Sequence, residues 1–255
     1  MPIPPPWSHR RIPTGQRQVT RASSRRRWPR WALWALSAAL ALTVAPLAML
    51  AILPPPTSAF MVQQLARNVA SGDWRLPDYR WVPAERISPQ LALAVIAAED
   101  QRFASHFGLD LEAIRRAADH NARGGRTRGA STITQQTVKN LFLWPGRSWL
   151  RKGLEAWLAL WMDLLLPKSR ILEIYLNLAQ FGANVYGAEA ASRHYFGVSA
   201  ARLDGGQAAL LAAVLPNPIR YRVDAPTAYV RSRQAWILAQ MRHLGPESLR
   251  AVHAR

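Results

Sequence analysis

Two short stretches of the sequence carry side chains that could do chemistry together. Glu99 ends an apolar run, and partial loss of solvent there would raise the pKa of its carboxyl toward the range useful for proton transfer. Residues 129–140 gather hydroxyls, side-chain amides and one ammonium group, including those of Ser131, Gln135, Lys139 and Asn140. Such groups suit the oxygens of a sugar or a phosphate. We therefore expect a base that faces a polar pocket suited to anions.

Each stretch also has a purely structural interpretation. A single glutamate at a helix end is usually a solvated surface residue, and polar residues at helical spacing are as often the exposed face of an amphipathic helix. Glu155 poses the same choice, because it stands four residues after Arg151 and three after Lys152, a spacing that by itself predicts a salt bridge. All the lysines of the chain fall at positions 139 to 168, whereas arginine supplies the positive charge elsewhere. This usage indicates that the lysine positions need a compact ammonium group.

Helices must position these residues, because the apolar residues recur with a helical period and we find no convincing period-2 strand. Ser88 and Pro89 read as an N-cap followed by proline at the first helical position, so a helix should run from 89 to about 103. Further helices are expected over about 111–121, 131–142, 151–166, 168–179, 205–215 and 226–244. The globular part should therefore be mostly α-helical.

The N-terminal part of the chain predicts a membrane anchor. Residues 31–53 contain no charged side chain, and a helix rising 1.5 Å per residue over that length spans a hydrocarbon core of about 30 Å. A cleavable signal peptide is the alternative, but its apolar region would be shorter, about 7–15 residues. Residues 1–30 are rich in arginine, which predicts a disordered tail in the cytoplasm. The rest of the chain would then lie in the periplasm, held to the inner membrane by a single span.

Composition narrows the function further. A net charge of +18 would suggest a nucleic-acid partner, but membrane topology explains the arginines of the tail, so we expect no nucleic acid. The chain has no cysteine, which excludes thiol chemistry and thiolate metal sites. Prolines and glycine after the span indicate a linker over 54–87. The catalytic domain should then cover 88–244, followed by a tail over 245–255.

Five motifs follow one another along the chain, and they begin at Glu99, Gly129, Arg151, Lys168 and Gly187. They read Glu-Asp-x-x-Phe-x-x-His-x-Gly, Gly-x-Ser-Thr-Ile-Thr-Gln-Gln-x-x-Lys-Asn, Arg-Lys-x-x-Glu, Lys-x-x-Ile-Leu-Glu-x-Tyr-Leu-Asn, and Gly-Ala with a later Tyr-Phe. On these motifs the sequence resembles the peptidoglycan glycosyltransferases of family 51, which polymerise lipid II. The resemblance covers about 88–244, and with no transpeptidase domain after it we expect the monofunctional, membrane-anchored form.

The resemblance implies a lysozyme-like, mostly α-helical fold of the α+β class, with a small membrane-associated jaw that includes residues 141–150. It implies that Glu99 is the general base, which takes the proton from the 4-hydroxyl of an acceptor lipid II. That oxygen would attack the anomeric carbon of the growing chain, displace undecaprenyl diphosphate and form a β-1,4 bond with inversion. Glu155 would act near the donor, or keep a structural role with Arg151.

The same resemblance implies the other site residues and the partners. The diphosphates would be held by cations, namely Lys139, Arg147, Arg151 and Lys152. Sugar or phosphate would be contacted by Ser131, Gln135 and Asn140. The sequence requires no cofactor, although Mg²⁺ or Mn²⁺ could bind at the diphosphate, and its protein ligands stay unassigned. Expected partners are lipid II, the growing glycan chain and the membrane, with proteins of cell-wall synthesis or division as further candidates.

Two other functions stay open from the sequence. A lytic glycan-cleaving enzyme would share the fold and use one essential glutamate as an acid. The cationic residues argue against it, because cleavage of a neutral glycan needs no group that binds diphosphate. A non-catalytic module that binds lipid II or anionic lipid would account for the charge and the apolar stretches, but it would leave Glu99 and Glu155 without a role.

Overall fold

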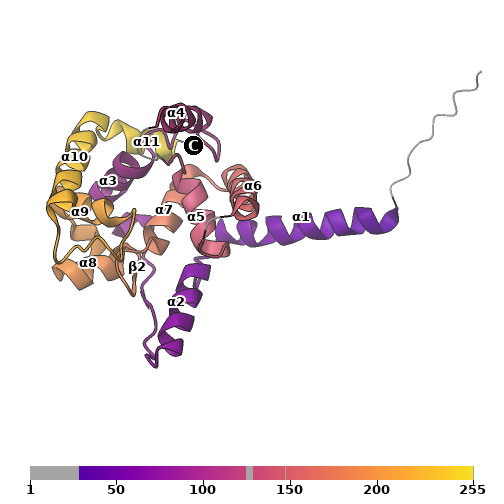
Figure 1. The fold of residues 1–255 in the computed structure, drawn as a ribbon, viewed down its shortest axis with the longest axis horizontal. Helices are drawn as coiled ribbons and strands as arrows, with labels where there is room; N and C mark the ends of the chain where they lie inside the picture. The colour runs from indigo at the N-terminus through magenta and orange to yellow at the C-terminus, as the bar shows by residue number, and fades with distance from the viewer. Residues whose placement is uncertain (1–28, 125–128, 147, 255) are drawn as a thin grey trace, which may run out of the picture. The chain divides into compact units, whose positions relative to one another are not determined.

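The computed structural model describes residues 29–124, 129–146 and 148–254, and this part of the chain is largely helical (Figure 1). The helices are α1 (Arg30–Leu50), α2 (Ala59–Ala70), α3 (Pro89–Glu99), α4 (Leu111–Ala122), α5 (Ile133–Phe142), α6 (Trp149–Leu165), α7 (Lys168–Leu178), α8 (Ala188–Phe196), α9 (Gly205–Val214), α10 (Ala228–Leu244) and α11 (Glu247–His253). Two short strands, β1 (Asp78–Tyr79) and β2 (Val185–Tyr186), pair in parallel, and η1 (Ala84–Arg86) and η2 (Ala200–Arg202) are 3₁₀ helices. The expected mostly helical fold is confirmed.

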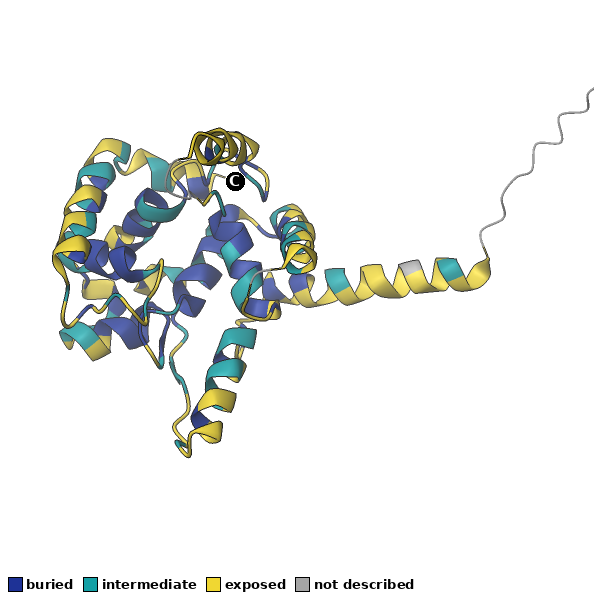
Figure 2. Cartoon of the chain, in the orientation of Figure 1, coloured by how far each residue is buried: buried dark blue, intermediate teal, exposed yellow. Residues whose placement is uncertain are grey.

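The chain divides into two compact units, residues 1–38 and 39–255, and α1 begins in the first and ends in the second. Among the described residues, α1 is the one helix long and apolar enough to cross a membrane by length and composition. Figure 2 shows that α1 is largely exposed along its length. Leu47 and Leu50, near its end, are buried in the core of the second unit. The expected tail lies outside the described residues, except for positions 29 and 30.

α3 is buried on most sides, as expected for a helix that is apolar around its whole circumference. Its N-cap is Ser88, whose hydroxyl accepts a hydrogen bond from the first turn and donates one of 2.7 Å to the carbonyl of Leu203. α3 packs against α9 and α10. It ends at Glu99, earlier than the expected end near 103. The physical reason is that Asp100 leaves the helical conformation, with a φ of −160°, and binds groups outside the helix.

The first turn of α5 is fixed by a capping box. The hydroxyl of Thr132 accepts a hydrogen bond of 3.1 Å from the backbone N–H of Gln135, and the side-chain oxygen of Gln135 accepts one of 3.0 Å from the N–H of Thr132. Thr132 also donates a hydrogen bond of 2.7 Å to the carbonyl of Gly108. α5 packs on α2, α6 and α7. The start of the helix that carries the second motif is therefore anchored to the core.

A buried ion pair fastens α6 to α7. The ammonium of Lys168 lies 2.6 Å from a carboxylate oxygen of Asp163, and both side chains are almost fully buried. Asp163 also accepts a hydrogen bond from the backbone N–H of Gly108. The same ammonium lies 4.6 Å from the ring centroid of Phe103. This lysine, at the start of the fourth motif, therefore joins several elements of the fold.

The segments on either side of the expected catalytic domain pack on it. Residues 54–87, expected as a linker, contain α2, β1 and η1, and α2 contacts α5 while β1 pairs with β2. Residues 245–255, expected as a tail, contain α11, which contacts α3 and α7 and buries Val252. The compact fold therefore extends beyond residues 88–244 at both ends, because these segments bury apolar side chains of their own.

Candidate active site

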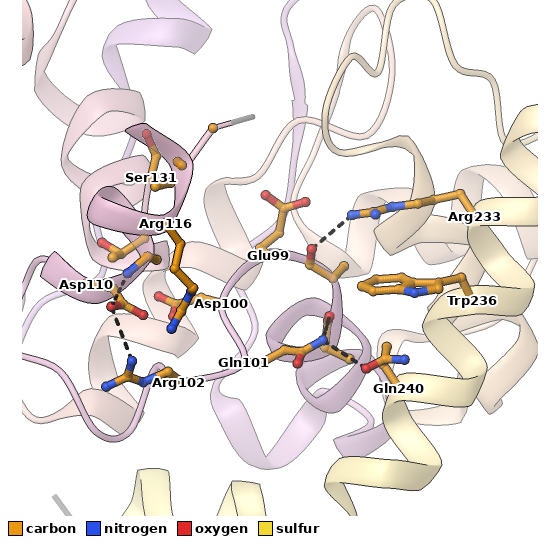
Figure 3. A pocket seen from close by; sticks show the side chains of 17 residues that line it. Glu99, Asp100, Gln101, Arg102, Asp110, Arg116, Ser131, Arg233, Trp236 and Gln240 are labelled. Atoms are coloured by element: carbon orange, nitrogen blue, oxygen red, sulfur yellow. Dashed lines mark hydrogen bonds and ion pairs between the residues drawn. The ribbon is translucent and has the colours of Figure 1, made fainter. Parts of the chain in front are cut away.

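A pocket of about 580 Å³ opens at the C-terminal end of α3. Its walls come from the end of α3 and the residues after it, from α4, from residues 129–132 and from α10. Figure 3 shows the carboxyl group of Glu99 in the middle of this pocket, with Ser131 on one side and Arg233 and Trp236 on the other. The carboxylate that the sequence singled out therefore lies in a pocket with polar walls.

The surroundings of Glu99 suit a group that accepts a proton. Burial raises the pKa of its carboxyl, and the neighbouring charge of Asp100 also raises it. A hydrogen bond of 2.8 Å from the side-chain amide of Gln136 lowers the pKa, as do the charges of Arg233 and Lys139, but the net shift is upward. A carboxylate with a raised pKa is a stronger base than a solvated one.

Asp100, the next residue, holds the fold together. Its two carboxylate oxygens lie 2.9 and 3.0 Å from Nε2 of His106, and one of them accepts a hydrogen bond of 3.0 Å from the backbone N–H of Ile133. Phe103, which lies between Asp100 and His106 in the sequence, is fully buried. In the first motif, Glu99 thus faces the pocket, while Asp100 ties the end of α3 to His106 and to the start of α5.

The third motif forms a cluster of opposite charges on the first turns of α6. Glu155 is 2% exposed, and its carboxylate accepts a hydrogen bond of 2.8 Å from Arg151 and another from Lys152. Lys152 also donates a hydrogen bond of 2.9 Å to the hydroxyl of Ser131, which lines the pocket that holds Glu99. The predicted salt bridge is confirmed, and the cluster meets the pocket through Ser131.

The ammonium of Lys139, on α5, interacts electrostatically with Glu99 and with the charged residues of α6. Burial lowers the pKa of its ammonium most, and the charges of Arg151 and Lys152 lower it too, while Glu155 and Glu99 raise it. Among the described residues its ammonium has no hydrogen-bond partner, so it is available to an anion. Lys139 therefore links Glu99 electrostatically to the cationic residues of α6.

A second pocket of about 340 Å³ is lined by Lys139 and Arg151 together with apolar neighbours. Those neighbours are Phe60 of α2 and residues 144–146, and the ammonium of Lys139 lies 5.7 Å from the ring centroid of Phe60. Cations next to aromatic and aliphatic side chains suit an anionic head group that carries an apolar chain.

The other predicted site residues occupy varied positions. Gln135 is 2% exposed and its side chain is engaged in the capping box with Thr132, a role that the sequence analysis did not assign to it. Asn140 is partly buried, one turn after Gln136 on α5. Arg147 lies outside the described residues.

Sequence reasoning missed the wall of the pocket that α10 supplies. This wall consists of Arg233, Trp236 and Gln240, and the amide of Gln101 donates a hydrogen bond of 3.2 Å to that of Gln240 across the pocket. The spacing of these three residues places them on one face of a helix. The sequence shows this spacing, but polar residues on the solvated face of an ordinary amphipathic helix have the same spacing.

Within the described ranges, no group of three or more His, Asp or Glu side chains could hold a metal ion. Around Glu99 lie the amide of Gln136, the cations Arg233 and Lys139, and one further carboxylate, that of Asp100, which is already bound to His106 and to the N–H of Ile133. This set does not fit a cation bound by the protein alone.

Residues 63–242 match the family model described as transglycosylase, which is more than half of the chain. The chain belongs to the transglycosylase family. The match begins within the segment expected as a linker, in agreement with the packing of α2 on α5. The lysozyme-like helical fold expected from the sequence is the fold of this family.

Proteins named biosynthetic peptidoglycan transglycosylase are similar to this family member over most of their length. The one from Cronobacter sakazakii is 54% identical over 204 residues, which cover 80% of this chain and 85% of the relative. The one from Pseudomonas putida strain KT2440 is 55% identical over 196 residues, 77% of this chain and 83% of the relative. The one from Aeromonas hydrophila is 61% identical over 173 residues, 68% of this chain and 74% of the relative.

Proposed function

We propose that this transglycosylase is a peptidoglycan glycosyltransferase that polymerises lipid II into β-1,4-linked glycan strands. The observation that carries the proposal is the pairing of a carboxylate with cations across one site. Glu99 shares its pocket with Ser131, whose hydroxyl is bonded to Lys152, and Lys139 is coupled to both ends of the site. The reaction needs both groups, because a hydroxyl must lose a proton while a diphosphate leaves with its charge.

Glu99 acts as the general base in this proposal. Its carboxylate accepts the proton of the sugar 4-hydroxyl, and that oxygen forms a bond to the anomeric carbon of the growing chain. The bond from that carbon to the diphosphate oxygen breaks at the same time, and its electron pair leaves with undecaprenyl diphosphate. Attack from the side opposite to the leaving group converts an α-linked donor into a β-linked product. The raised pKa of Glu99 supports this role, since it makes the carboxylate a stronger proton acceptor.

Lys139, Arg151 and Lys152 stabilise the negative charge that grows on the leaving diphosphate. Glu155 compensates part of the charge of Arg151 and Lys152 in the absence of substrate and fixes their geometry. We therefore assign Glu155 a positioning role, and we keep sugar or phosphate contacts for Ser131 and Asn140 and phosphate contact for Arg147 as predictions. A divalent cation, if it takes part, would be held mainly by the diphosphate oxygens.

The membrane supplies the substrate in this proposal. α1 would anchor the chain in the inner membrane as a single span, with its N-terminus in the cytoplasm and the catalytic domain in the periplasm. The region that follows α5 and starts α6 supports contact with lipid, because Trp149 is 94% exposed and Leu150 is 71% exposed. Proteins of cell-wall synthesis or division are proposed as further partners, with no surface assigned to them.

Polymerisation of labelled lipid II, followed by gel separation of the products, tests the proposal directly. We expect the wild-type protein to make long glycan and Glu99→Gln to lose at least about 10²–10⁴-fold in rate. Glu247→Gln is the matched control, because Glu247 is an exposed acid on α11. Release of soluble fragments from polymeric peptidoglycan would favour the lytic alternative. Binding of lipid II with no turnover would favour a non-catalytic module.

A further inference from the structure

We propose that Arg233, on α10, is a positioning residue for Glu99, whose guanidinium favours the charged carboxylate that proton abstraction requires. The inference rests on the proposed function, because it assumes that Glu99 acts as a base. Arg233 lies outside the five motifs and far from Glu99 in the sequence, and only the packing of α10 against α3 brings the two into one pocket.

The guanidinium is held in place by two kinds of contact. Nη2 of Arg233 donates a hydrogen bond of 3.0 Å to the carbonyl of Ala98, the residue before Glu99 (Figure 3). The guanidinium carbon lies 4.6 Å from the ring centroid of Trp236, at the distance of a cation–π contact. These contacts fix the cation at the C-terminal end of α3, beside the carboxyl group, where a positive charge is favourable.

One nitrogen of this guanidinium makes no hydrogen bond to the described residues. Nε of Arg233 is buried and has no hydrogen-bond partner within the part of the chain that the structure describes. A buried donor without a partner costs free energy. An attraction to a nearby carboxylate offsets such a loss, because a charge interaction does not require a direct hydrogen bond.

Charged and titratable groups face Glu99 from each element that packs around it. Asp100 follows it in the chain, Lys139 comes from α5, Tyr175 comes from α7 and Arg233 comes from α10. The same pocket is also lined by charged groups of α4 and the segment before it, namely Arg102, Asp110 and Arg116. Asp100 raises the pKa of Glu99, whereas Arg233 and Lys139 lower it, and Arg233 has the larger effect of the two cations. The hydroxyl of Tyr175 stays neutral, because burial holds its pKa well above its ordinary value.

The two cations have different tasks in the presence of substrate. Lys139 is also coupled to Arg151, Lys152 and Glu155, so a bound diphosphate competes with Glu99 for its charge. Arg233 lines the opposite wall of the pocket, together with Trp236. Its charge therefore remains directed at Glu99 when the phosphate site is filled. The pKa of Glu99 should therefore depend on Arg233 during turnover.

The test compares pH profiles of kcat/KM for lipid II polymerisation by the full-length protein. In Arg233→Gln we expect the acidic limb of the profile to move to higher pH by about half a unit to one unit. Arg233→Lys keeps the charge, so its limb should stay close to that of the wild type even if the rate falls. Arg231→Gln is the matched control, because Arg231 is an exposed arginine on the same helix.

A second measurement does not depend on activity. The ¹³C shift of the Glu99 carboxyl, assigned by its loss in Glu99→Gln, reports the protonation of this group as the pH is changed. Arg233→Gln should move the midpoint of this titration to higher pH, as it does the acidic limb of the kinetic profile. A loss of rate by one factor at all pH values, with an unchanged midpoint, would overturn the inference and leave Arg233 as a clamp on α3. Absence of polymer from the wild type would instead refute the proposed function, while the shift titration would still decide the role of Arg233.

Discussion

The side-chain amide of Gln136 donates a hydrogen bond of 2.8 Å to Oε2 of Glu99, and its oxygen accepts one of 3.2 Å from the hydroxyl of Tyr175. The carboxyl group at the centre of the pocket is therefore oriented by a chain of hydrogen bonds that starts in the core. Tyr175 is almost fully buried on α7, so the orientation is set by the packing of α7 against α5.

Gln136→Leu should slow polymerisation by about tenfold to a hundredfold, because a hydrogen bond to a charged group contributes about 1.5–3 kcal/mol. In the wild type this hydrogen bond favours the charged form of Glu99. Its loss should therefore raise the pKa of Glu99 and move the acidic limb of kcat to higher pH. Tyr175→Phe keeps the amide and removes its support, so we expect a smaller loss. Equal rates for wild type and Gln136→Leu across the pH range would contradict this assignment.

Glu99→Gln should raise the thermal stability of the protein at neutral pH while it removes activity. Burial raises the folded-state pKa of Glu99 above its unfolded value, so the folded protein binds a proton more readily than the unfolded chain does. This carboxyl therefore destabilises the fold at pH values above its folded pKa, and the penalty disappears as the pH falls below its unfolded pKa. A neutral amide avoids the penalty. Calorimetry should give a higher Tm for Glu99→Gln at pH 7 and a smaller difference near pH 4; a lower Tm at pH 7 would refute the prediction.

Glu155→Gln should destabilise the protein, because Arg151 and Lys152 then face each other without their shared counter-charge. Loss of one partner from a buried ion pair costs about 3–5 kcal/mol. Arg151→Gln in the same chain should restore part of the loss, with a coupling energy of about 1–3 kcal/mol in a double-mutant cycle. The double variant should still polymerise lipid II poorly, since it lacks a phosphate ligand. Additive effects of the two substitutions on unfolding would exclude the positioning role of Glu155.

Gly108→Ala should destabilise the fold by more than about 1 kcal/mol without moving the pH profile of the reaction. Gly108 has a φ of +62°, and a Cβ atom there would lie 2.8 Å from the carbonyl oxygen of Ala159 on α6. Gly153→Ala is the matched control, because Gly153 lies inside α6 and a Cβ atom there meets no atom within 4 Å. Gly153→Ala should be neutral or stabilising, as alanine is favoured in helices. Similar melting temperatures for the two variants would contradict the close contact of Gly108 with α6.

Local patterns allowed much of the fold and part of the site to be predicted. The spacing of Ser88 and Pro89 gave the start of α3, and the spacing of Arg151 and Glu155 gave their salt bridge, because caps and i, i+4 pairs depend on residues that are neighbours along the chain. The prediction that Glu99 faces a polar pocket also held, since an acid that ends an apolar helix emerges at the edge of a core.

Contacts between distant segments decided the rest. α3 stops at Glu99 because Asp100 binds His106 and the start of α5, and no local pattern shows that Ile133 will supply a donor there. Gln135 reads as a polar group for substrate, but burial commits its side chain to a helix cap.

The sequence by itself determined the helical class, the apolar N-terminal segment, the carboxylate and the cations, because residue type and periodicity express these directly. The tertiary structure alone decided that α10 brings Arg233 and Trp236 to the same pocket as Glu99. Electrostatic influence depends on distance in space and on the exclusion of water, and neither is set by the order of residues along the chain.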